Sequence, residues 1–322
     1  MWDQTLQRIK HNQTPLLAAR RWSEQIEAVH LVNKGVNLVY YFEHENQRFY
    51  LRITHQKLRP KKQLLAAILY QQHLFQSQVA ICEPVQSSRG EWIESIQQED
   101  DYFLAHVCKE VPGQPIHFLY DDNHLYRLWG KTLGSLHKAT QSYDPNNFDY
   151  AHWKKSVREM HQYAKNEEVK VQNTLDQVTK CLNLRQKNTD NFGLTHGDHR
   201  QGNVLTNGHT IHIIDFDLPA YNWFSEDVFR PFFDSILEND QNFKSKIHPY
   251  LEGYFEVMSE NSIDLSAFAL QFQIKCLEIY LWTKNNWSDD SDAPGGHDKM
   301  QWLDNIYHKI IRDDWIERLP ML

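Results

Sequence analysis

Residues Leu194 to Asp217 read LTHGDHRQGNVLTNGHTIHIIDFD, and this stretch decides the expected fold. Four histidines and three aspartates fall within it, in a chain of otherwise ordinary composition. Such side chains hold metal ions and move protons, so two kinds of site compete. One is a transition-metal site built on the histidines. The other is a magnesium and phosphate site built on Asp and Asn.

Asp198 and Asn203 are five residues apart in the segment HGDHRQGN, the spacing of a kinase catalytic loop. Phosphoryl transfer from ATP needs a carboxylate near the attacking hydroxyl and oxygen ligands for Mg²⁺. The segments NVL and TIHIID then predict two short strands joined by the Asn207-Gly208 turn, a strong hairpin signal. Asp215 ends the second strand, where the hairpin would bring it back beside Asn203. Together these features favour phosphotransfer.

The same HGDH letters leave a zinc site open, because they share an HxDH core with zinc hydrolases of the metallo-β-lactamase kind. Those enzymes carry a further His two residues upstream, where this chain has Leu194. Zinc needs three or four converging ligands, and His209 and His212 could supply two only if the hairpin folded inward. The zinc hydrolase is therefore the weaker alternative.

The first hundred residues predict an antiparallel sheet with one crossing helix. Segments of strand composition lie at 30–34 (HLVNK), 39–44 (VYYFEH), 48–54 (RFYLRIT), 81–85 and 102–107. In RFYLRIT, the residues Phe49, Leu51 and Ile53 share one face. A helix is expected over 58–75, entered at Pro60. The polar segment SSRGEWIESIQQEDD should contain a turn at Arg89-Gly90.

After Pro112-Gly113 the pattern changes to helices. Helical segments are expected at 125–138, at 149–184 as one or two helices, and at 226–260, 265–287 and 299–317. The stretch SDDSDAPGG at 288–296 is expected to be a surface loop. We therefore expect two lobes, with residues 1–108 as a nucleotide-binding sheet plus one helix. Residues 109–322 would hold the catalytic hairpin and a helical substrate region.

Composition narrows the class of protein. The chain has 322 residues, of which 41% are hydrophobic and 13% aromatic, enough for a core and against general disorder. A net charge of -8 argues against binding nucleic acid or an anionic membrane. Four separated cysteines without a CxxC, and an N-terminus without an apolar leader, lead us to expect the cytosol. Nothing indicates the oligomeric state.

HGDHRQGNVL followed by IIDFD resembles the aminoglycoside phosphotransferase/choline kinase superfamily, and GKTLGSLHKAT resembles its helix ending in Leu-His. Within the superfamily the chain is most similar to the bacterial stress-response kinase and homoserine-kinase-like branch. The resemblance covers residues 28–290. It implies an α+β, protein-kinase-like fold with a small antiparallel N-terminal lobe and a larger, mostly helical C-terminal lobe. It also implies Mg²⁺-dependent transfer of the ATP γ-phosphate to a hydroxyl of a small molecule or a protein serine or threonine.

The resemblance assigns roles to five residues of this chain. Asp198 is the catalytic base, and Asn203 and Asp215 are the Mg²⁺ ligands. Asp217 is a further metal or substrate contact. Asp227, in SEDVFRPFF, is a structural tether for the catalytic loop.

Four more residues are candidates for a substrate contact or a supporting role. His196 is expected to fix the loop through backbone hydrogen bonds. His199 and Arg200 either contact substrate or phosphate or are simply exposed. Trp282 either packs in the core or lines the acceptor cleft, where an aromatic ring would suit a cationic substrate. The acceptor itself cannot be identified from these motifs.

The expected nucleotide-binding residues depart from the usual kinase pattern. The strand Lys that contacts the α- and β-phosphates is replaced by Arg52, a planar fork rather than a compact ammonium. Tyr50 stands where a small residue usually leaves room for adenine. No Asp or Glu lies between Asn46 and Ile81, so the helix has no carboxylate to pair with Arg52.

The loop KGVNLVY contains a single glycine, and we expect Gly35 and Asn37 near the phosphates. Backbone groups of Ala105 and Val107, in a hinge region near 104–113, are expected to bind the base. The unusual nucleotide side leaves a second function class open: a pseudokinase or nucleotide-sensing scaffold without catalysis.

Overall fold

The computed structural model describes residues 13–35, 37–98, 101–116, 122–146, 148–238, 243–287 and 298–312. The chain forms two compact units. Unit 1 comprises Met1–Ile116, Ser142–Tyr150 and Asn203–Asp217, and unit 2 comprises His117–Gln141, Ala151–Gly202 and Leu218–Leu322. Unit 1 is built on an antiparallel sheet and unit 2 is mostly helical, so the expected α+β class is confirmed.

The units differ from the expected lobes, which had a boundary after Cys108. Strand β6 (Asp101–Lys109) runs past that residue, and β7 (Gln114–Pro115) pairs with β10 (Val204–Thr206). These hydrogen bonds place the hairpin in unit 1 rather than with the helices.

The large sheet of unit 1 is antiparallel throughout. Its strands are β1 (His30–Lys34), β2 (Leu38–His44), β3 (Gln47–His55), β4 (Pro84–Val85), β5 (Glu94–Gln98) and β6. The order is β1-β2-β3-β6-β4, with β5 also paired to β6. Glu45 and Asn46 have positive φ angles of 51° and 59°, as a tight turn between β2 and β3 requires. The three-stranded start is therefore confirmed.

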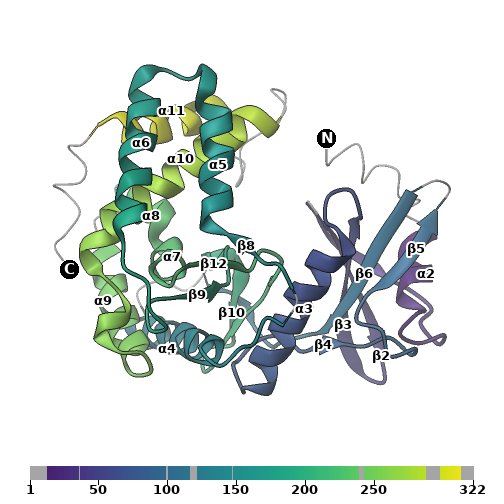
Figure 1. Cartoon of the computed structure of the whole chain (residues 1–322). Helices are drawn as coiled ribbons and strands as arrows, with labels where there is room; N and C mark the ends of the chain where they lie inside the picture. The colour runs from purple at the N-terminus through teal and green to yellow at the C-terminus, as the bar shows by residue number, and fades with distance from the viewer. Residues whose placement is uncertain are drawn as a thin grey trace. The chain divides into compact units, whose positions relative to one another are not determined.

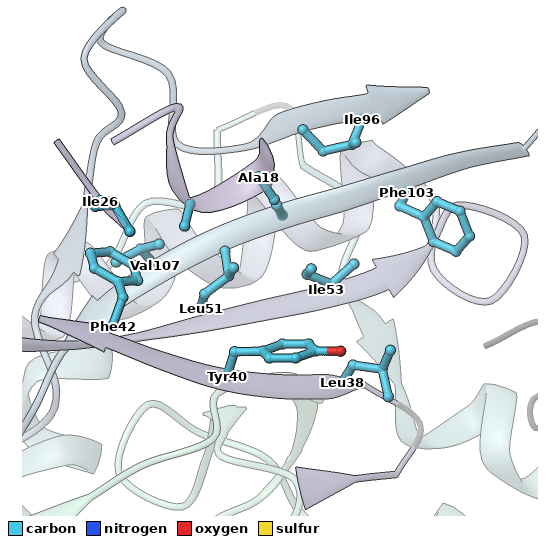
Figure 2. Packing of buried hydrophobic residues seen from close by; sticks show 12 residues of the cluster. Ala18, Ile26, Leu38, Tyr40, Phe42, Leu51, Ile53, Ile96, Phe103 and Val107 are labelled. Atoms are coloured by element: carbon cyan, nitrogen blue, oxygen red, sulfur yellow. The ribbon is translucent and has the colours of Figure 1, made fainter. Parts of the chain in front are cut away.

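Alternate residues of β3 and β6 face opposite sides of the sheet. Leu51 and Ile53 pack with the short helix α2 (Thr14–Ala19) in one apolar cluster, which Figure 2 shows around Ala18 and Val107. The other face packs against helix α3 (Lys61–Gln76), where Leu64 and Ile68 meet Leu104. Arg52 and its cross-strand partner His106 lie on this α3 side, because their neighbours along the strands face α2.

Strand β5 was not expected, because the segment ESIQQ is polar. Its burial nevertheless alternates, with Glu94 and Ile96 buried. Burial of Glu94 is possible because Arg89 and Ser87 satisfy its carboxylate. The expected turn is present, since Gly90 has a φ of +78° and its N–H donates to the carbonyl of Ser87.

The predicted hairpin is confirmed. Strand β10 pairs with β11 (Ile211–Ile213), with Val204 opposite Ile213. In the turn between them, the Asn207 side chain accepts hydrogen bonds from the backbone N–H groups of His209 and Thr210. Gly208 has a φ of +90°, which favours glycine.

Unit 2 contains the expected helices: α4 (Asn123–Thr140), α5 (Trp153–Tyr163), α6 (Val169–Leu184), α7 (Ser225–Phe229), α8 (Phe233–Leu237), α9 (Phe243–Phe255), α10 (Phe268–Asn286) and α11 (Lys299–Ile311). A small sheet was not expected: β12 (Ala220–Trp223) lies between β8 (Ala151–His152) and β9 (Phe192–Thr195). The stretch 288–296 lies outside the described residues. Across the described ranges, no helix is long and apolar enough to cross a membrane.

Helices α4 and α9 lie side by side in unit 2 (Figure 1). Their backbones approach so closely that glycines are needed at the contact. A Cβ atom on Gly130 would lie 1.8 Å from the carbonyl oxygen of Tyr250, and one on Gly253 would lie 1.8 Å from that of Arg127. This packing holds α4, whose last turn supports the HGD loop described next.

Candidate active site

The HGD segment follows β9 and is fixed by glycine and by a buried carboxylate. Gly197 has a φ of +83°, and a Cβ there would lie 2.0 Å from the carbonyl oxygen of Leu218, so only glycine fits. Asp227 in α7 accepts hydrogen bonds from the backbone N–H groups of His196 at 2.6 Å and of Gly197 at 3.0 Å. Asp227 thus has the geometry of the tether that the resemblance implied.

Asp227 is in turn held by α4. His137 Nε2 lies 3.2 Å from its carboxylate, and His137 Nδ1 lies 2.9 Å from the hydroxyl of Tyr254. Burial opposes the charged form of Asp227, but the hydrogen bond from His137 outweighs it and the pKa is lowered to about 2. Burial also lowers the pKa of His137. A charged Asp227 beside His137 is therefore the resting arrangement.

Asp198, the expected base, has a side chain that is 30% exposed. Its Oδ2 lies 3.0 Å from Nε of Arg200, and its Oδ1 lies 3.3 Å from Nη2 of Arg230. Arg200 therefore forms an ion pair with the Asp198 carboxylate. Arg230 was missed from the sequence, because it lies far along the chain, in the short helix Arg230–Phe232, and no spacing rule links it to Asp198.

The two histidines of the loop are fully buried. The ring Nδ1 of His196 lies 3.3 Å from the backbone N–H of Asp198, which it can accept. His199 Nε2 accepts a hydrogen bond from the indole of Trp129 at 2.8 Å, and burial lowers the pKa of His199 to about 3. A neutral, enclosed ring has no surface for an acceptor, so the substrate contact considered for His199 is not supported. Nor is the ring exposed, so we interpret His199 as a structural residue.

The expected metal ligands lie in unit 1, at the open ends of the hairpin strands. The backbone N–H of Ile214 donates to the carbonyl of Asn203 at 2.9 Å, so Asn203 and Asp215 flank paired strands. Asp215 has a φ of +71°, a left-handed conformation that is strained for a non-glycine residue and typical of functional sites. One carboxylate and one amide oxygen are the donors that Mg²⁺ prefers, so the residues fit that ion.

Arg52 reaches the carboxylates that follow the hairpin. Its Nη2 lies 2.8 Å from Oδ1 of Asp215 and 3.0 Å from Oδ2 of Asp217. Burial opposes the charge of Arg52, but the two carboxylates raise its pKa above the usual range. His106, opposite Arg52, has its pKa lowered to about 4 by burial, and Asp217 opposes this effect only in part. This corner of unit 1 therefore holds charged groups that are partly removed from solvent.

The predicted base-binding role of Ala105 and Val107 stays a prediction, and their place in the sheet does not favour it. Ala105 pairs with β3 on one side and with β5 on the other, and Val107 pairs with β3 and β4. Both side chains are buried in the core. The backbone groups of a central strand are used within the sheet and are not free for adenine. The apolar segment FLAHVC (residues 103–108) is compatible by composition with either a buried core strand or a hinge.

Gly35 and Asn37 form the tight connection between β1 and β2. The N–H of Gly35 donates to the carbonyl of Asn37 at 3.0 Å. The Asn37 side chain donates to the carboxylate of Asp217. The expected loop therefore touches the segment after the hairpin within unit 1.

Unit 2 contains a cavity of about 190 Å³ between α5, β9, β12, α7 and α10. Gly197, directly before Asp198, is part of its lining. The charged lining residues form one group: Lys275 Nζ lies 2.7 Å from both Glu226 and Glu278. Burial raises the pKa of Glu226, although Lys275 opposes this effect. Trp282 does not line this cavity; it lies further along α10, is partly exposed, and contacts Trp287.

The zinc alternative finds no ligand set in the part of the chain that the structure describes. No group of three or more His, Cys, Asp or Glu side chains there could hold a metal ion. The hairpin does not turn its histidines inward together, since His209 is exposed in the turn and His212 is half-buried on β11.

An HGD loop tied to a buried aspartate, with a hairpin that ends in Asp, places this chain in the class of kinase-like phosphotransferases. The comparison with protein families makes this specific. The model of the Phosphotransferase enzyme family, APH, matches residues 30–243, and the chain belongs to that family. The predicted superfamily and the predicted enzyme class are confirmed, while the narrower branch stays a prediction.

Individual relatives agree with this assignment. The amicoumacin kinase of Bacillus subtilis (strain 168) is 28% identical over 228 residues, covering 69% of this chain and 68% of that protein. A solved amicoumacin kinase in complex with AMP-PNP and Ca²⁺ has a TM-score of 0.84 at 20% identity, covering 99% of this chain and 97% of that one. A microcompartment-associated aminopropanol kinase has a TM-score of 0.73 at 17% identity, covering 92% and 94%. The two structural likenesses show a shared fold.

Proposed function

We propose that this enzyme transfers the γ-phosphate of ATP to a hydroxyl group of a small acceptor that also carries an amino group. One observation supports the acceptor class above all. Gly197, adjacent to Asp198, lines a cavity whose charged residues are two glutamates and one lysine. The names of the relatives, an amicoumacin kinase and an aminopropanol kinase, agree with a small-molecule acceptor.

Each functional residue has a defined task in this reaction. Asp198 orients the acceptor hydroxyl and takes its proton, and Arg200 and Arg230 hold the carboxylate in place. Asn203 and Asp215 would hold Mg²⁺, which neutralises charge on the phosphates when it is bound. Arg52 contributes a fixed positive charge to the phosphates.

The cavity favours a cationic group on the acceptor. Lys275 can neutralise only one of the two carboxylates that it contacts, so the cluster formed with Glu226 and Glu278 keeps one negative charge. A charge in a partly desolvated site attracts a counter-ion more strongly than it would in water. Ser156, Asn222 and Gln271 provide hydrogen-bonding groups in the same lining. A primary amine on the acceptor would complete this group.

Two other functions are less well supported. A peptide acceptor would need an extended groove, whereas the lining here encloses a small volume. A scaffold without catalysis was suggested by the absence of a carboxylate on the α3 helix. Membership in a family of phosphotransferase enzymes speaks against it, and Arg52 has carboxylate partners elsewhere.

The test is ADP release from ATP and Mg²⁺ with a panel of small amino alcohols and the matching alcohols that lack the amine. We expect turnover with amino alcohols and at least about tenfold lower kcat/KM without the amine, the value of one charged hydrogen bond. Glu278→Gln should raise KM for the amino alcohol and leave KM for ATP unchanged. Glu159→Gln, an exposed change on α5, is the matched control. Equal turnover of acceptors with and without the amine would refute the acceptor class.

A further inference from the structure

Arg52 needs a partner that fixes its guanidinium group in position to contact the nucleotide. Arg52 lies on the side of the sheet that α3 covers, where a helix carboxylate would be its expected partner. The sequence of α3 contains no Asp or Glu, and its first turn carries Lys61 and Lys62 instead. A guanidinium without a fixed partner would adopt many conformations, because the arginine side chain has high rotamer entropy. Some other carboxylate must therefore orient it.

Asp217 meets this requirement. Its side chain is 11% exposed, and Oδ2 lies 3.0 Å from Nη2 of Arg52. Oδ1 lies 3.0 Å from Nη1 of Arg59, the residue before Pro60 at the start of α3. Asn37 also donates to Oδ2. Both carboxylate oxygens are thus engaged by groups from three separate segments of unit 1, which leaves Asp217 poorly suited to the metal or substrate contact first considered for it.

Asp215 is more exposed than Asp217 and has fewer contacts with arginine, as expected of a residue that binds a metal ion. Its side chain is 30% exposed, and only Oδ1 contacts Arg52. If Asp215 turns toward a bound cation, Arg52 keeps its contact with Asp217. The two neighbouring carboxylates therefore suit different roles: the more exposed Asp215 is free to bind a cation, and the less exposed Asp217 is engaged by Arg52 and Arg59.

We propose that Asp217 is the positioning residue for Arg52 and Arg59, and that it takes the place of the carboxylate that α3 lacks. Asp217 holds the two guanidinium groups at a fixed separation, and its contact with Asn37 links them to the loop after β1. The ligand that these cations would receive is the phosphate chain of a nucleoside triphosphate. The inference rests on the proposed function, because it assumes that Arg52 contacts those phosphates.

The test measures ATP binding by titration calorimetry, with Mg²⁺ and without acceptor, so that it does not depend on turnover. Asp217→Asn should weaken ATP binding at least about tenfold, the value of one charged contact. Arg52→Gln should do the same, and the double variant should be no weaker than Arg52→Gln alone, because Asp217 acts through Arg52. Asp217→Glu should recover part of the affinity. In steady-state assays with varied ATP, Asp217→Asn should change KM for ATP more than kcat.

Arg48→Gln is the matched control, since Arg48 lies on the same strand but pairs with Glu43 and Glu110 at the surface. It should leave ATP binding unchanged. If Asp217→Asn does not fold, the charge-balanced pair Asp217→Asn/Arg59→Gln replaces it. The inference is overturned if a folded variant without Asp217 binds ATP as wild type does, or if the Asp217 and Arg52 effects add fully. A wild-type protein that bound no ATP would instead overturn the proposed function itself.

Discussion

Replacement of Asp227 by Asn tests how the HGD loop is held. Asp227 is fully buried and accepts from His196 N, Gly197 N and the ring of His137. Asparagine has nearly the same shape but no charge, and only one of its two terminal atoms can accept a hydrogen bond. At least one of these donors is then left without its acceptor.

The expected cost follows from the pKa of Asp227. A pKa lowered from 3.8 to about 2 corresponds to about 2.4 kcal/mol of preference for the charged form, at 1.36 kcal/mol per pKa unit. Loss of one charge-assisted hydrogen bond costs roughly 1.5–3 kcal/mol, which agrees. We therefore expect Asp227→Asn to lower the free energy of unfolding by about 2–4 kcal/mol.

The sign of the pH dependence is also fixed. The folded-state pKa of Asp227 is lowered, so its contribution is present above pH 3.8 and is lost as the pH falls toward 2. The assay is urea unfolding followed by tryptophan fluorescence, because Trp129 and Trp223 are buried in the same unit. Asp304→Asn, an exposed change on α11, is the control. A loss below about 0.5 kcal/mol for Asp227→Asn, typical of surface changes, would refute the tether.

Three further predictions concern single residues. Gly130→Ala should lower the free energy of unfolding by about 2 kcal/mol or more, because its Cβ would collide with a backbone carbonyl of α9. In the same urea titration, Lys138→Ala, an exposed change on α4, should alter the free energy of unfolding little. His199 stays neutral in the folded state down to about pH 3 but takes a proton near 6.5 when unfolded, so stability should fall between these values as the pH drops. His199→Asn should flatten that fall; an unchanged slope would contradict the assignment. Arg230→Gln should lower kcat about tenfold through a looser Asp198 and leave KM for ATP unchanged in steady-state assays; an unchanged kcat would show that the contact is incidental.

The sequence predicts those parts of the fold that depend on residues close to one another along the chain. The Asn207-Gly208 turn and the flanking apolar residues were sufficient for the hairpin, and alternation in RFYLRIT was sufficient for β3. The polar strand β5 was missed because its buried Glu94 depends on a partner rather than on its own hydropathy. The base-binding residues could not be located from the sequence, because a buried central strand and a hinge share the same apolar composition.

The contacts of the site residues depend on distance in space and could not be predicted. Asp217 meets Arg52 and Arg59 across more than 150 positions of the chain, and no periodicity connects them. Arg230 contacts Asp198 from a separate helix, and no periodicity connects these two residues either. The sequence could show only that the usual α3 carboxylate was missing, which was the one available signal that another residue must replace it.

The most direct test of the central claim is single-turnover phosphoryl transfer with Asp198→Asn, in parallel with a calorimetric measurement of ATP binding. Transfer from ATP to an amino alcohol should fall by about 10²–10⁴-fold, the usual contribution of a positioned base, while ATP should bind as it does to wild type. Undiminished transfer by the Asp198→Asn protein would contradict the mechanism.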